Sequence, residues 1–522
     1  MEFTDLLNLV RDGAVTDICT DSRKVGKGAV FVAVRGTTCD GHDFISQAVE
    51  RGAGAVVSQL SVSDMAANMK LSLPGNVDVV VVDDTTRAAG VLAQAFYGNP
   101  ADKLVNLAVT GTNGKTTVAY LVQACIRTSG RKCGLVSTVT CDTGTEIFES
   151  EMTTPDCLSI AKMQSMMVAA GCEYMVIEAS SHALDQNRLA GIKFRAAAFT
   201  NLSGDHLDYH HTEQEYLNAK TKLFSALQPD CVAVLNKQSP QAKLIAQQMR
   251  AEILWYAVDE PADISAEVLS MKPDGTTFVL RYAGRQVQVK TALPGLYNVS
   301  NNLAAAGLVL AAGLDPETAA QGLCSAGTIP GRLERVGIAP EGSGSAPAVL
   351  IDYAHTDDAL ENVLRTLRPL CTGRLTVVFG CGGDRDKSKR PRMAAAAQKF
   401  ADDIYVTSDN PRTEDPADII SDIMTGFDAA GTTDVNVEGS ADSSLYKDTE
   451  RHNPQSIYVE PDRKKAVESA IKSAHKDDLI LIAGKGHETY QIIGKKKYPF
   501  SDKALAEQFL LKYHSSDNTI ST

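Results

Sequence analysis

The sequence predicts an α/β protein of three domains, built mainly on parallel β-sheets. Apolar runs typical of buried strands alternate with helical patterns over almost the whole chain. The length of 522 residues fits about three domains, at roughly 150 residues each. A glycine-rich loop also stands between a strand pattern and a helix pattern in the first half of the chain. Together these observations favour parallel strands joined by helices.

The predicted strands are short apolar runs with no polar face. Strands buried on both faces read in this way, and they occur mostly in parallel sheets covered by helices. In chain order they are residues 29–34, 77–82, 105–109, 174–177, 231–235, 349–351, 375–379, 404–406 and 479–482.

Two segments rich in turn-forming or small residues mark the domain boundaries. Residues 98–103 precede the strand that leads into the glycine loop. Residues 331–335 are followed by the small-residue stretch 341–347. The predicted domains are therefore residues 1–102, 103–333 and 334–522. Residues 426–458 are polar and rich in Gly, Ser, Thr and Asp, which predicts a long surface loop or insertion.

Charge and cysteine content narrow the class of protein. The net charge of -13 argues against nucleic acid as the main partner, because binding phosphate backbones needs a dominant basic surface. The 11 cysteines are dispersed, and none forms a Cys-x-x-Cys pair. Such a set is typical of reduced thiols rather than of a disulfide framework or a zinc site.

The sequence also predicts no association with a membrane. The opening residues 1–7 carry charges where a signal peptide would need an apolar run. No stretch approaches the roughly 20 apolar residues of a membrane helix. We therefore expect a cytoplasmic enzyme or binding protein, and a monomer.

The glycine loop predicts a phosphate site. Residues 105–109 form a predicted strand, the loop spans Thr110, Gly111, Thr112, Asn113 and Gly114, and Lys115, Thr116 and Thr117 open a helix. Backbone N–H groups and the positive end of a helix then surround phosphates. Lys115 can reach the terminal phosphates, and Thr116 can offer its hydroxyl to Mg²⁺. Position 109, where the general P-loop pattern has its first Gly, is Val, so an ordinary glycine turn is the alternative.

Two further side chains are candidates for magnesium chemistry. Glu178 follows the predicted strand 174–177, at the carboxyl end where α/β proteins bind ligands. His206 lies in a polar segment further along the chain. Taken singly, Glu178 could be a solvated carboxylate and His206 a structural histidine.

A series of motifs resembles one enzyme family, over roughly residues 20 to 495. In order they are Thr110-Gly-Thr-Asn-Gly-Lys-Thr-Thr117, Glu178-Ala-Ser-Ser-His-Ala-Leu184, Asp205-His-Leu-Asp-Tyr-His210, Gly331-Arg-Leu-Glu-Arg335, Asp352-Tyr-Ala-His-Thr356, Asp409-Asn-Pro-Arg412 and Gly484-Lys-Gly-His-Glu488. Together they are similar to the Mur ligases, and within these to the branch that extends UDP-MurNAc-L-Ala-D-Glu with meso-diaminopimelate.

The resemblance implies an architecture and a reaction. A uridine-nucleotide domain, a P-loop ATPase-like domain and a Rossmann-like domain for the amino acid are expected in that order. ATP would phosphorylate the D-Glu carboxylate, and the incoming amine would attack the acyl-phosphate to give an amide, ADP and phosphate. Positioning and charge neutralisation supply most of the catalysis in such reactions.

The resemblance also implies roles for residues of the ATP site. Lys115 would neutralise phosphate charge, Thr116 and Glu178 would hold one Mg²⁺, and His206 a second. The implied ATP-binding residues are Gly111, Thr112, Asn113, Gly114, Lys115, Thr116, Thr117, Asn298, Asn301, Arg332, Asp352 and His355. Helix capping is the competing interpretation of Asn298.

Lys220 is the least obvious candidate. Its amphipathic surroundings, residues 216–224, would suit a solvated surface lysine. The resemblance implies instead that CO₂ carbamoylates it, which makes an anionic oxygen ligand for the second Mg²⁺. Lys222 lies two residues away and points elsewhere on a helix, so the assignment depends on matching Lys220.

Further polar residues match the contacts of the sugar-nucleotide substrate. The implied set is Ser22, Thr153, Thr154, Ser180, Gln186 and Arg188. Hydroxyls and an Arg suit an anionic ligand. Thr153 and Thr154 could instead form a simple turn before Pro155. The segments 21–23 and 41–42 resemble the uridine site, and Ser22 is the implied contact there.

The third domain carries the predicted amino-acid site. Diaminopimelate differs from lysine by a distal carboxylate, which an Arg fork can hold in a bidentate pair. The implied contacts are Arg385, Asp409, Asn410, Pro411, Arg412, Gly484 and Glu488. Arg390 is the rival of Arg385 for a substrate carboxylate.

Two alternatives of different kinds stay open. One is a sibling enzyme, either a lysine-adding or other Mur ligase or a folylpolyglutamate synthetase-like protein. The motif at Arg412 and the complete first domain count against it. The other is a binding or scaffold protein that kept the fold without catalysis. The presence of Lys115, Glu178, His206 and Lys220 argues against that interpretation.

Overall fold

The computed structural model describes residues 1–36, 39–69, 73–204, 206–337, 346–427, 434–437 and 456–514. Asp205, most of the predicted loop 426–458 and most of the small-residue stretch 341–347 lie outside these ranges. The described residues form three α/β units, and the predicted fold class is confirmed.

The first unit is a four-stranded parallel sheet with the order β1-β2-β3-β4. Its strands are β1 (Ile18–Cys19), β2 (Val30–Val32), β3 (Ala55–Ser58) and β4 (Asp78–Val81). Its helices are α1 (Phe3–Arg11), η1 (Ser22–Lys24), η2 (Gly41–Phe44), α2 (Ile45–Glu50), α3 (Val62–Met69) and α4 (Thr85–Phe96).

The central unit contains an 11-stranded sheet with the order β15-β14-β13-β12-β11-β10-β5-β9-β6-β7-β8. Its strands are β5 (Val105–Thr110), β6 (Cys133–Val136), β7 (Thr140–Asp142), β8 (Ile147–Glu149), β9 (Tyr174–Glu178), β10 (Phe194–Phe199), β11 (Val232–Asn236), β12 (Glu252–Val258), β13 (Ile264–Lys272), β14 (Gly275–Tyr282) and β15 (Arg285–Thr291). The middle of the sheet is parallel, whereas β13–β14–β15 and β6–β7–β8 pair antiparallel at its two ends.

Two apolar cores cover the central sheet, one on each face. One core joins α5 (Lys115–Thr128), α11 (Leu296–Ala311) and α12 (Pro316–Ser325) to the sheet. The other joins α6 (Cys157–Ala169), α9 (Glu213–Ser225) and α10 (Pro240–Ala246). The short helices are η3 (Pro100–Lys103), α7 (Ser181–Asp185) and α8 (Leu207–His210). Burying both faces explains why the middle strands read as continuous apolar runs.

The third unit is a seven-stranded sheet with the order β16-β17-β22-β18-β19-β21-β20. Its strands are β16 (Glu334–Val336), β17 (Ala348–Asp352), β18 (Leu375–Phe379), β19 (Asp403–Val406), β20 (Asp434–Val437), β21 (Ser456–Val459) and β22 (Leu479–Ala483). Among the described strands of this sheet, only β16 pairs antiparallel. A separate hairpin joins β23 (Tyr490–Ile493) to β24 (Lys496–Pro499).

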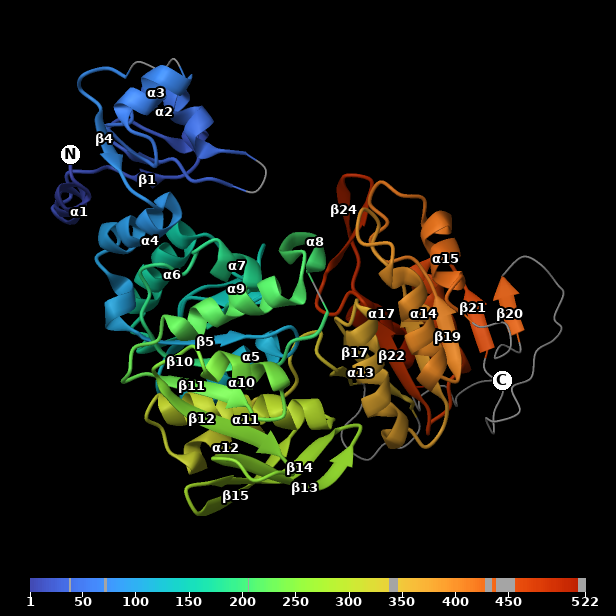
Figure 1. Cartoon of the computed structure of the whole chain (residues 1–522). Coiled ribbons are helices and arrows are strands. Elements are labelled where there is room, and N and C mark those ends of the chain that lie inside the picture. The colour runs from blue at the N-terminus through green and yellow to red at the C-terminus, as the bar shows by residue number, and fades with distance from the viewer. Residues whose placement is uncertain are drawn as a thin grey trace.

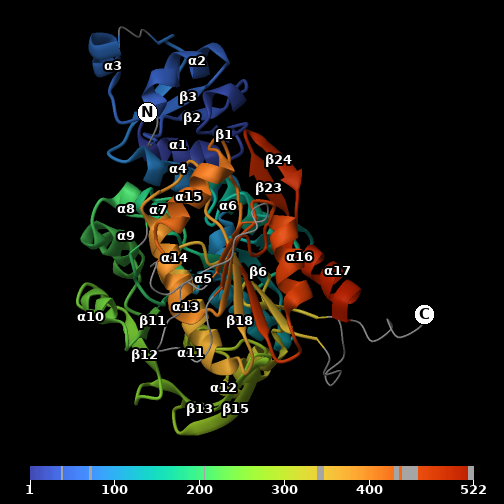
Figure 2. The ribbon, with the colours of Figure 1, turned by 90° about the vertical axis from the view of Figure 1, so that its right-hand side faces the viewer.

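Helices cover both faces of this third sheet, as Figure 2 shows. On one face lie α13 (Asp357–Leu367), followed by η4 (Arg368–Leu370), α14 (Lys389–Phe400) and α15 (Pro416–Met424). On the other face lie α16 (Arg463–Ser473) and α17 (Asp502–His514).

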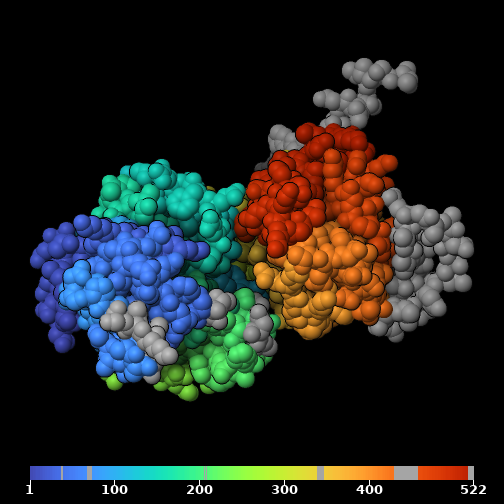
Figure 3. Space-filling view, turned by 90° about the horizontal axis from the view of Figure 1, so that it is seen from above, coloured from blue at the N-terminus to red at the C-terminus, as the bar shows by residue number. Residues whose placement is uncertain are grey.

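The three units meet closely. The first lies over the central unit and the third stands beside it (Figures 1 and 3). A Cβ added at Gly90 of α4 would collide with the backbone of Ala190 in the central unit. Gly331, at the junction of the second and third units, has φ 64° and would collide with the backbone at His487. Glycine is therefore required at both contacts, at Gly331 because of its positive φ as well.

A buried ion pair ties the helix layer of the third unit to its sheet. Arg463 and Asp502 both have fully buried side chains, and Arg463 Nη2 lies 2.7 Å from Asp502 Oδ2. The same Nη2 donates a hydrogen bond of 2.8 Å to the carbonyl of Ala483, at the end of β22. The pair therefore fixes the beginnings of α16 and α17 against the strand end that precedes Gly484.

We expect Arg463→Met to destabilise the protein by about 3–5 kcal/mol, because Asp502 would become an unpaired buried carboxylate. Thermal or urea unfolding measures this loss. The exposed neighbour Lys464 provides the control, since Lys464→Met should change stability by less than about 0.5 kcal/mol. The double variant with Asp502→Leu should recover part of the stability, and equal losses in the single and double variants would contradict the ion-pair explanation.

Candidate active site

One cleft of about 490 Å³ brings residues of the central and third units together. The central unit contributes the phosphate loop, at the carboxyl end of β5, and Glu178, at the end of β9. The third unit contributes Asp352, Tyr353 and His355 from the end of β17. Ligands bind at the carboxyl ends of parallel strands in such sheets, so this cleft is the candidate active site.

The phosphate loop is shaped by two glycines with positive φ. Gly111 has φ 148° and Gly114 has φ 89°. A Cβ at Gly111 would meet the Thr200 hydroxyl, and one at Gly114 would meet the side chain of Asn301. The loop is further fixed by the Asn113 N–H, which donates to Asn201 Oδ1 at 3.0 Å. The backbone is thus held at the N-terminus of α5, where N–H groups can face an anion.

Lys115 and Thr116 begin α5 beside this loop. Lys115 Nζ donates to the carbonyls of Gly111 and Thr112, at 3.0 and 2.7 Å. Arg332, which comes after the junction glycine Gly331, donates from Nη2 to Thr116 Oγ1 at 3.1 Å. Two cations, one at the start of α5 and one beside the junction of the second and third units, therefore lie at one end of the loop, where they can neutralise a polyphosphate.

Glu178 is fully buried at the end of β9, so the interpretation as a solvated carboxylate is wrong. Its Oε1 accepts the backbone N–H of Thr138 at 2.8 Å, and its Oε2 accepts the Thr138 hydroxyl at 3.0 Å. Thr138 was not among the sequence candidates, because it lies 40 residues away in the chain. It holds the carboxylate in place within the cleft.

Lys220 is buried rather than solvated, with an exposed fraction of 1%. Its Nζ donates to the carbonyl of Gly111 at 2.8 Å and lies 4.2 Å from the ring centre of Tyr216. The interpretation as a surface lysine is therefore wrong. Lys222, in contrast, is exposed and lies 2.7 Å from a carboxylate oxygen of Asp185. Lys220 thus reaches the phosphate loop from α9.

His206 lies at the edge of the cleft and is exposed, with φ 55°. Its ring centre is 4.9 Å from that of His182 and 6.1 Å from that of Tyr216. His206 and Lys220 therefore share Tyr216 as a neighbour.

Two asparagines of α11 complete the phosphate side of the cleft. The N-cap of α11 is Gly295, so the capping interpretation of Asn298 is wrong. Asn298 Nδ2 donates to the Pro294 carbonyl at 2.8 Å, and Asn301 Nδ2 donates to Asn298 Oδ1 at 3.1 Å. This chain of hydrogen bonds directs Asn301 towards Gly114.

The third unit closes the cleft with Asp352 and the residues that follow it. Burial raises the pKa of Asp352, although its carboxylate accepts the N–H groups of Leu333 and Ala354, each at 2.8 Å. His355 Nδ1 donates to the Tyr353 carbonyl at 2.9 Å. The guanidinium of Arg332 lies 4.9 Å from the Tyr353 ring centre. Arg332, Asp352 and His355 therefore all line the predicted ATP site.

His487 lies against this group and gives it a pH dependence. Burial, and secondarily the charge of Arg332, lower the pKa of His487 from 6.5 to about 4. The unfolded chain therefore binds a proton at higher pH than the folded chain does. The stabilising contribution is complete above about pH 6.5 and is lost as the pH falls through about 4.

The melting temperature of the wild type should fall when the pH is lowered from about 7.5 to about 4.5. We expect this fall to be smaller in the His487→Gln variant. His475 is an exposed histidine of the same unit, so His475→Gln serves as the matched control and should follow the wild type. Differential scanning calorimetry at the two pH values decides the matter. An unchanged pH response in His487→Gln would show that this side chain does not cause the effect.

The predicted sugar-nucleotide residues of the central unit form one polar cluster beside Glu178. Thr154 Oγ1 donates to the Glu178 carbonyl at 2.7 Å and accepts the Ser180 N–H at 3.0 Å. Arg188 donates to the Thr154 carbonyl at 2.9 Å and to Gln186 Oε1 at 2.7 Å. Thr153 reaches the cleft itself. The two threonines are thus part of a network and not only a turn before proline.

Ser22 lies apart from this cluster, in the first unit. It is buried, and its Oγ donates to Gln47 Oε1 at 2.6 Å. The neighbouring His42 is held by Asp40 Oδ1 at 2.6 Å from its Nδ1. Of the predicted sugar-nucleotide set, Ser22 alone belongs to this unit.

The predicted amino-acid residues meet at the ends of β19 and β22. Asn410 Nδ2 donates to Glu488 Oε2 at 2.9 Å, which joins the two motifs. Arg412 has φ 51°, and its backbone N–H donates to the Ile492 carbonyl at 3.1 Å. The Gly494 N–H donates to the Arg412 carbonyl at 2.7 Å. The β23–β24 hairpin therefore holds the loop that contains Asp409 and Pro411.

The two rival arginines have different surroundings. Arg390 is fully buried and lies 2.9 Å from Glu414 and 2.8 Å from Asp422. Arg385 is exposed. Because Arg390 is already paired with two carboxylates, Arg385 is the better candidate for a substrate carboxylate.

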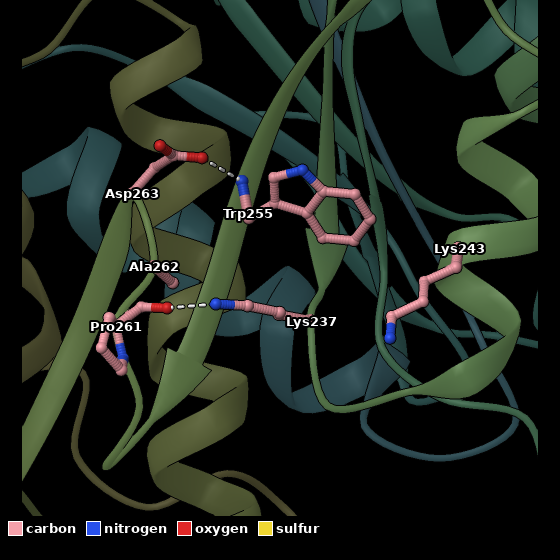
Figure 4. A pocket seen from close by; sticks show the side chains of 6 residues that line it. All are labelled: Lys237, Lys243, Trp255, Pro261, Ala262 and Asp263. Carbon is pink, nitrogen blue, oxygen red and sulfur yellow. Dashed lines mark hydrogen bonds between the residues drawn. The ribbon is translucent and has the colours of Figure 1, made fainter.

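A second cavity of about 470 Å³ lies outside this site, beside β12. Figure 4 shows the Trp255 ring close to the Lys237 side chain, with Lys243 on a neighbouring helix, and Lys237 Nζ donates a hydrogen bond to the Pro261 carbonyl. None of the predicted site residues lines it.

The donor set of the main cleft fits a hard cation. Thr116 Oγ1 and the buried Glu178 carboxylate offer oxygen ligands beside a loop built for phosphates. Within the described ranges, no three His, Cys, Asp or Glu side chains are grouped as a metal site by themselves. Waters, which Mg²⁺ usually keeps, and oxygens of a bound substrate or a modified side chain would complete the ligands of such a cation. No helix of the described chain is long and apolar enough to cross a membrane.

Comparison with known proteins matches three successive parts of the chain to family models. Family models match residues 14–97 (Mur ligase family, catalytic domain), 109–309 (Mur ligase middle domain) and 331–486 (Mur ligase, glutamate ligase domain).

Two curated relatives that the chain covers almost completely carry the same enzyme name. UDP-N-acetylmuramoyl-L-alanyl-D-glutamate–2,6-diaminopimelate ligases from Geobacillus thermodenitrificans and Bacillus licheniformis are 42% and 40% identical, covering 93% and 96% of both chains. A solved structure of a ligase with this name is 31% identical and covers 96% of both chains, with a TM-score of 0.65. The chain belongs to the Mur ligase family.

Proposed function

We propose that this ATP-dependent ligase joins meso-2,6-diaminopimelate to UDP-MurNAc-L-Ala-D-Glu through an acyl-phosphate, in the synthesis of peptidoglycan precursors. One observation carries the proposal. A single cleft joins a phosphate loop and a buried carboxylate of the central unit to residues of the unit that contains Arg412. The names of the relatives support the same reaction.

We propose one task for each domain. Residues 1–102 would bind the uridine nucleotide, with Ser22 among the contacts. Residues 103–333 would bind ATP, and residues 334–522 the amino acid. The extents of the three sheets support this division, because no sheet crosses either boundary in the described chain.

ATP would lie along the phosphate loop. Its phosphates would contact the backbone from Gly111 to Thr117, with Lys115 and Arg332 neutralising the charge that develops as the γ-phosphoryl group moves. Asn298, Asn301, Asp352 and His355 would complete the nucleotide site, which their positions in the cleft support.

The reaction would proceed in two steps. The D-Glu carboxylate attacks the γ-phosphorus, the bond to the bridging oxygen of ADP breaks, and an acyl-phosphate forms. The amine of diaminopimelate then attacks the acyl carbon, phosphate leaves, and a proton passes to solvent. Because an acyl-phosphate hydrolyses in water, a cleft closed by two units favours transfer to the amine.

Mg²⁺ would be held by Thr116 and Glu178, and a second ion by His206 and a carbamoylated Lys220. When bound, these ions supply charge neutralisation for the phosphates. Thr138 supports the first site, because it fixes both carboxylate oxygens of Glu178. Carbamoylation forms an N–C bond from the neutral Lys220 amine to CO₂ and releases one proton.

We expect Lys220→Ala to lower the ligation rate by roughly a hundredfold, because an anionic ligand is lost. A small carboxylate such as acetate can enter the vacated volume and should restore part of the activity. The rate is measured by ADP release with and without acetate. The exposed Lys222→Ala provides the control and should keep its activity. Full activity of Lys220→Ala without acetate would contradict the carbamate assignment.

The sugar-nucleotide peptide would lie over Thr153, Thr154, Ser180, Gln186 and Arg188. Their shared hydrogen-bond network beside Glu178 supports this, since the D-Glu carboxylate must come close to the γ-phosphate. The cation of Arg188 suits an anionic ligand.

Diaminopimelate would lie between Arg385 and the loop of Asp409, Asn410, Pro411 and Arg412, with Gly484 and Glu488 opposite. Arg412 would hold the distal carboxylate, which lysine lacks. Lysine would leave the guanidinium unpaired, so rejection of lysine should be strong.

ADP release tests the proposal. With UDP-MurNAc-L-Ala-D-Glu and ATP, the enzyme should release ADP with meso-diaminopimelate and very little with L-lysine. Equal rates with the two amino acids would overturn the specificity. No release with either one would overturn the reaction. We also propose that the enzyme acts as a cytoplasmic monomer, which sedimentation of the purified protein would test for the oligomeric state.

A further inference from the structure

Lys485 is a fully buried lysine at the centre of the amino-acid site. It follows β22, between Gly484 and Glu488, and its side chain has an exposed fraction of 0%. A buried ammonium is stable only where carboxylates or other acceptors surround it. The surroundings of Lys485 must therefore supply acceptors for its ammonium, which water supplies to exposed lysines.

The ammonium of Lys485 has three acceptors. Nζ lies 3.0 Å from Glu488 Oε2, 3.1 Å from Asn410 Oδ1 and 3.4 Å from Asp409 Oδ1. An ammonium has three N–H donors, so these contacts match its full capacity. Lys485 is thus directed at side chains of both motifs, with its donors engaged before any substrate arrives.

These contacts determine how the Asn410 amide is oriented. Its Oδ1 accepts from Lys485 Nζ and from the Ile492 N–H, at 2.9 Å, so both lone pairs are used. Its Nδ2 donates to Glu488 Oε2. Among the hydrogen bonds of the described residues, none uses the second N–H of the Asn410 amide or Oε1 of Glu488. These two groups can therefore contact a ligand.

A donor beside a carboxylate oxygen is complementary to one end of an amino acid. The amide N–H suits an α-carboxylate, and the Glu488 oxygen suits an α-ammonium. We propose that Lys485 is the positioning residue of this pocket: it fixes Asn410 and Glu488 so that together they bind one zwitterionic end of the amino-acid substrate. This inference rests on the proposed function.

Removing the Lys485 ammonium would leave the neighbouring carboxylates without their cation. Asp409 and Glu488 would lose the cation between them, and Asn410 Oδ1 would lose a donor. The side chains of Asn410 and Glu488 would then move out of the geometry that binds the substrate. Displacements of about 1 Å can lower a rate by roughly a hundredfold. We therefore expect Lys485→Met to raise the KM for diaminopimelate by roughly a hundredfold.

The other substrates provide the internal comparison. Because the side chains that accept hydrogen bonds from Lys485 (Asp409, Asn410 and Glu488) lie outside the phosphate loop, the KM for ATP should stay within about twofold. Acyl-phosphate formation, followed as ATP–ADP isotope exchange with UDP-MurNAc-L-Ala-D-Glu and no amino acid, should also continue. A general loss of folding would lower both reactions together.

Two variants complete the experiment. Lys485→Arg restores the cation and should recover part of the diaminopimelate KM. Lys496→Met removes an exposed lysine from the adjoining hairpin and is the matched control, expected to behave as the wild type. If Lys485→Met is recovered unfolded, Lys485→Gln keeps donors in the buried position and gives the same readout.

The outcomes separate the two proposals. A wild type that ligates diaminopimelate, together with an unchanged KM in Lys485→Met or Lys485→Gln, would overturn the role of Lys485 alone. A wild type that does not ligate diaminopimelate would overturn the proposed function first. A selective rise in that KM, with ATP–ADP exchange intact, is the result that supports Lys485 as a positioning residue.

Discussion

Lys115→Ala should lower the rate of ADP formation by roughly a thousandfold, while the protein remains folded. The ammonium at the start of α5 lies beside the carbonyls of Gly111 and Thr112, at the loop proposed to hold the phosphates. In phosphoryl transfer, charge on the phosphate oxygens must be neutralised by positioned cations. Arg332 remains in the variant, so a residual rate is expected.

The control for this experiment is Lys162→Ala. Lys162 is an exposed lysine on α6 of the same unit, so its loss removes the same charge without approaching the cleft. ADP release at saturating ATP, with melting temperatures for both variants, distinguishes lost catalysis from lost folding. Undiminished turnover in Lys115→Ala would sink the proposed mechanism.

Arg412→Ala should raise the KM for diaminopimelate by roughly a thousandfold and leave the KM for ATP nearly unchanged. The side chain donates from Nη1 to the Gly383 carbonyl at 2.8 Å, and the hairpin holds its backbone. A guanidinium fixed in this way can meet the distal carboxylate with two parallel hydrogen bonds. Arg412→Lys keeps the charge but not the fork, so its KM should lie between those of wild type and alanine variant.

Arg392→Ala serves as the control, because Arg392 is exposed on α14 and pairs with Asp357. Steady-state kinetics with each substrate varied in turn separate the two KM values. Equal losses in affinity for ATP and diaminopimelate would point to a folding defect instead.

Each strand predicted from the sequence has a parallel neighbour in the structure, although several other parallel strands, among them β3 and β12, were not predicted. β5, β9 and β22 are continuous apolar runs because both faces are buried, and this pattern needs no knowledge of distant residues. Strand β14 instead alternates between buried and half-exposed positions, and β13 does so only over its first three residues, with polar residues in both strands. They were missed, as was β10, whose alanines give only a weak strand signal.

Site residues that are close together in the chain could be predicted, whereas those with distant partners could not. Gly111, Gly114 and Lys115 stand together in the chain, so their spacing alone predicts a phosphate loop. Thr138 and Lys485 were missed because their roles depend on partners 40 and 76 residues away. A lysine is usually exposed, and only the fold shows that three acceptors meet around this one. The roles of the individual site residues stay predictions until the variants are measured.

The network around Lys485 also bears on how substrate choice can change. Asn410, Glu488 and the Ile492 N–H come from separate segments, yet each depends on the same few hydrogen bonds. A single substitution in one segment would break the network before another could replace it. Engineering the enzyme to accept a different amino acid should therefore require simultaneous changes in both motifs and in the hairpin. Libraries that vary one position at a time should yield inactive proteins rather than ones with a new preference.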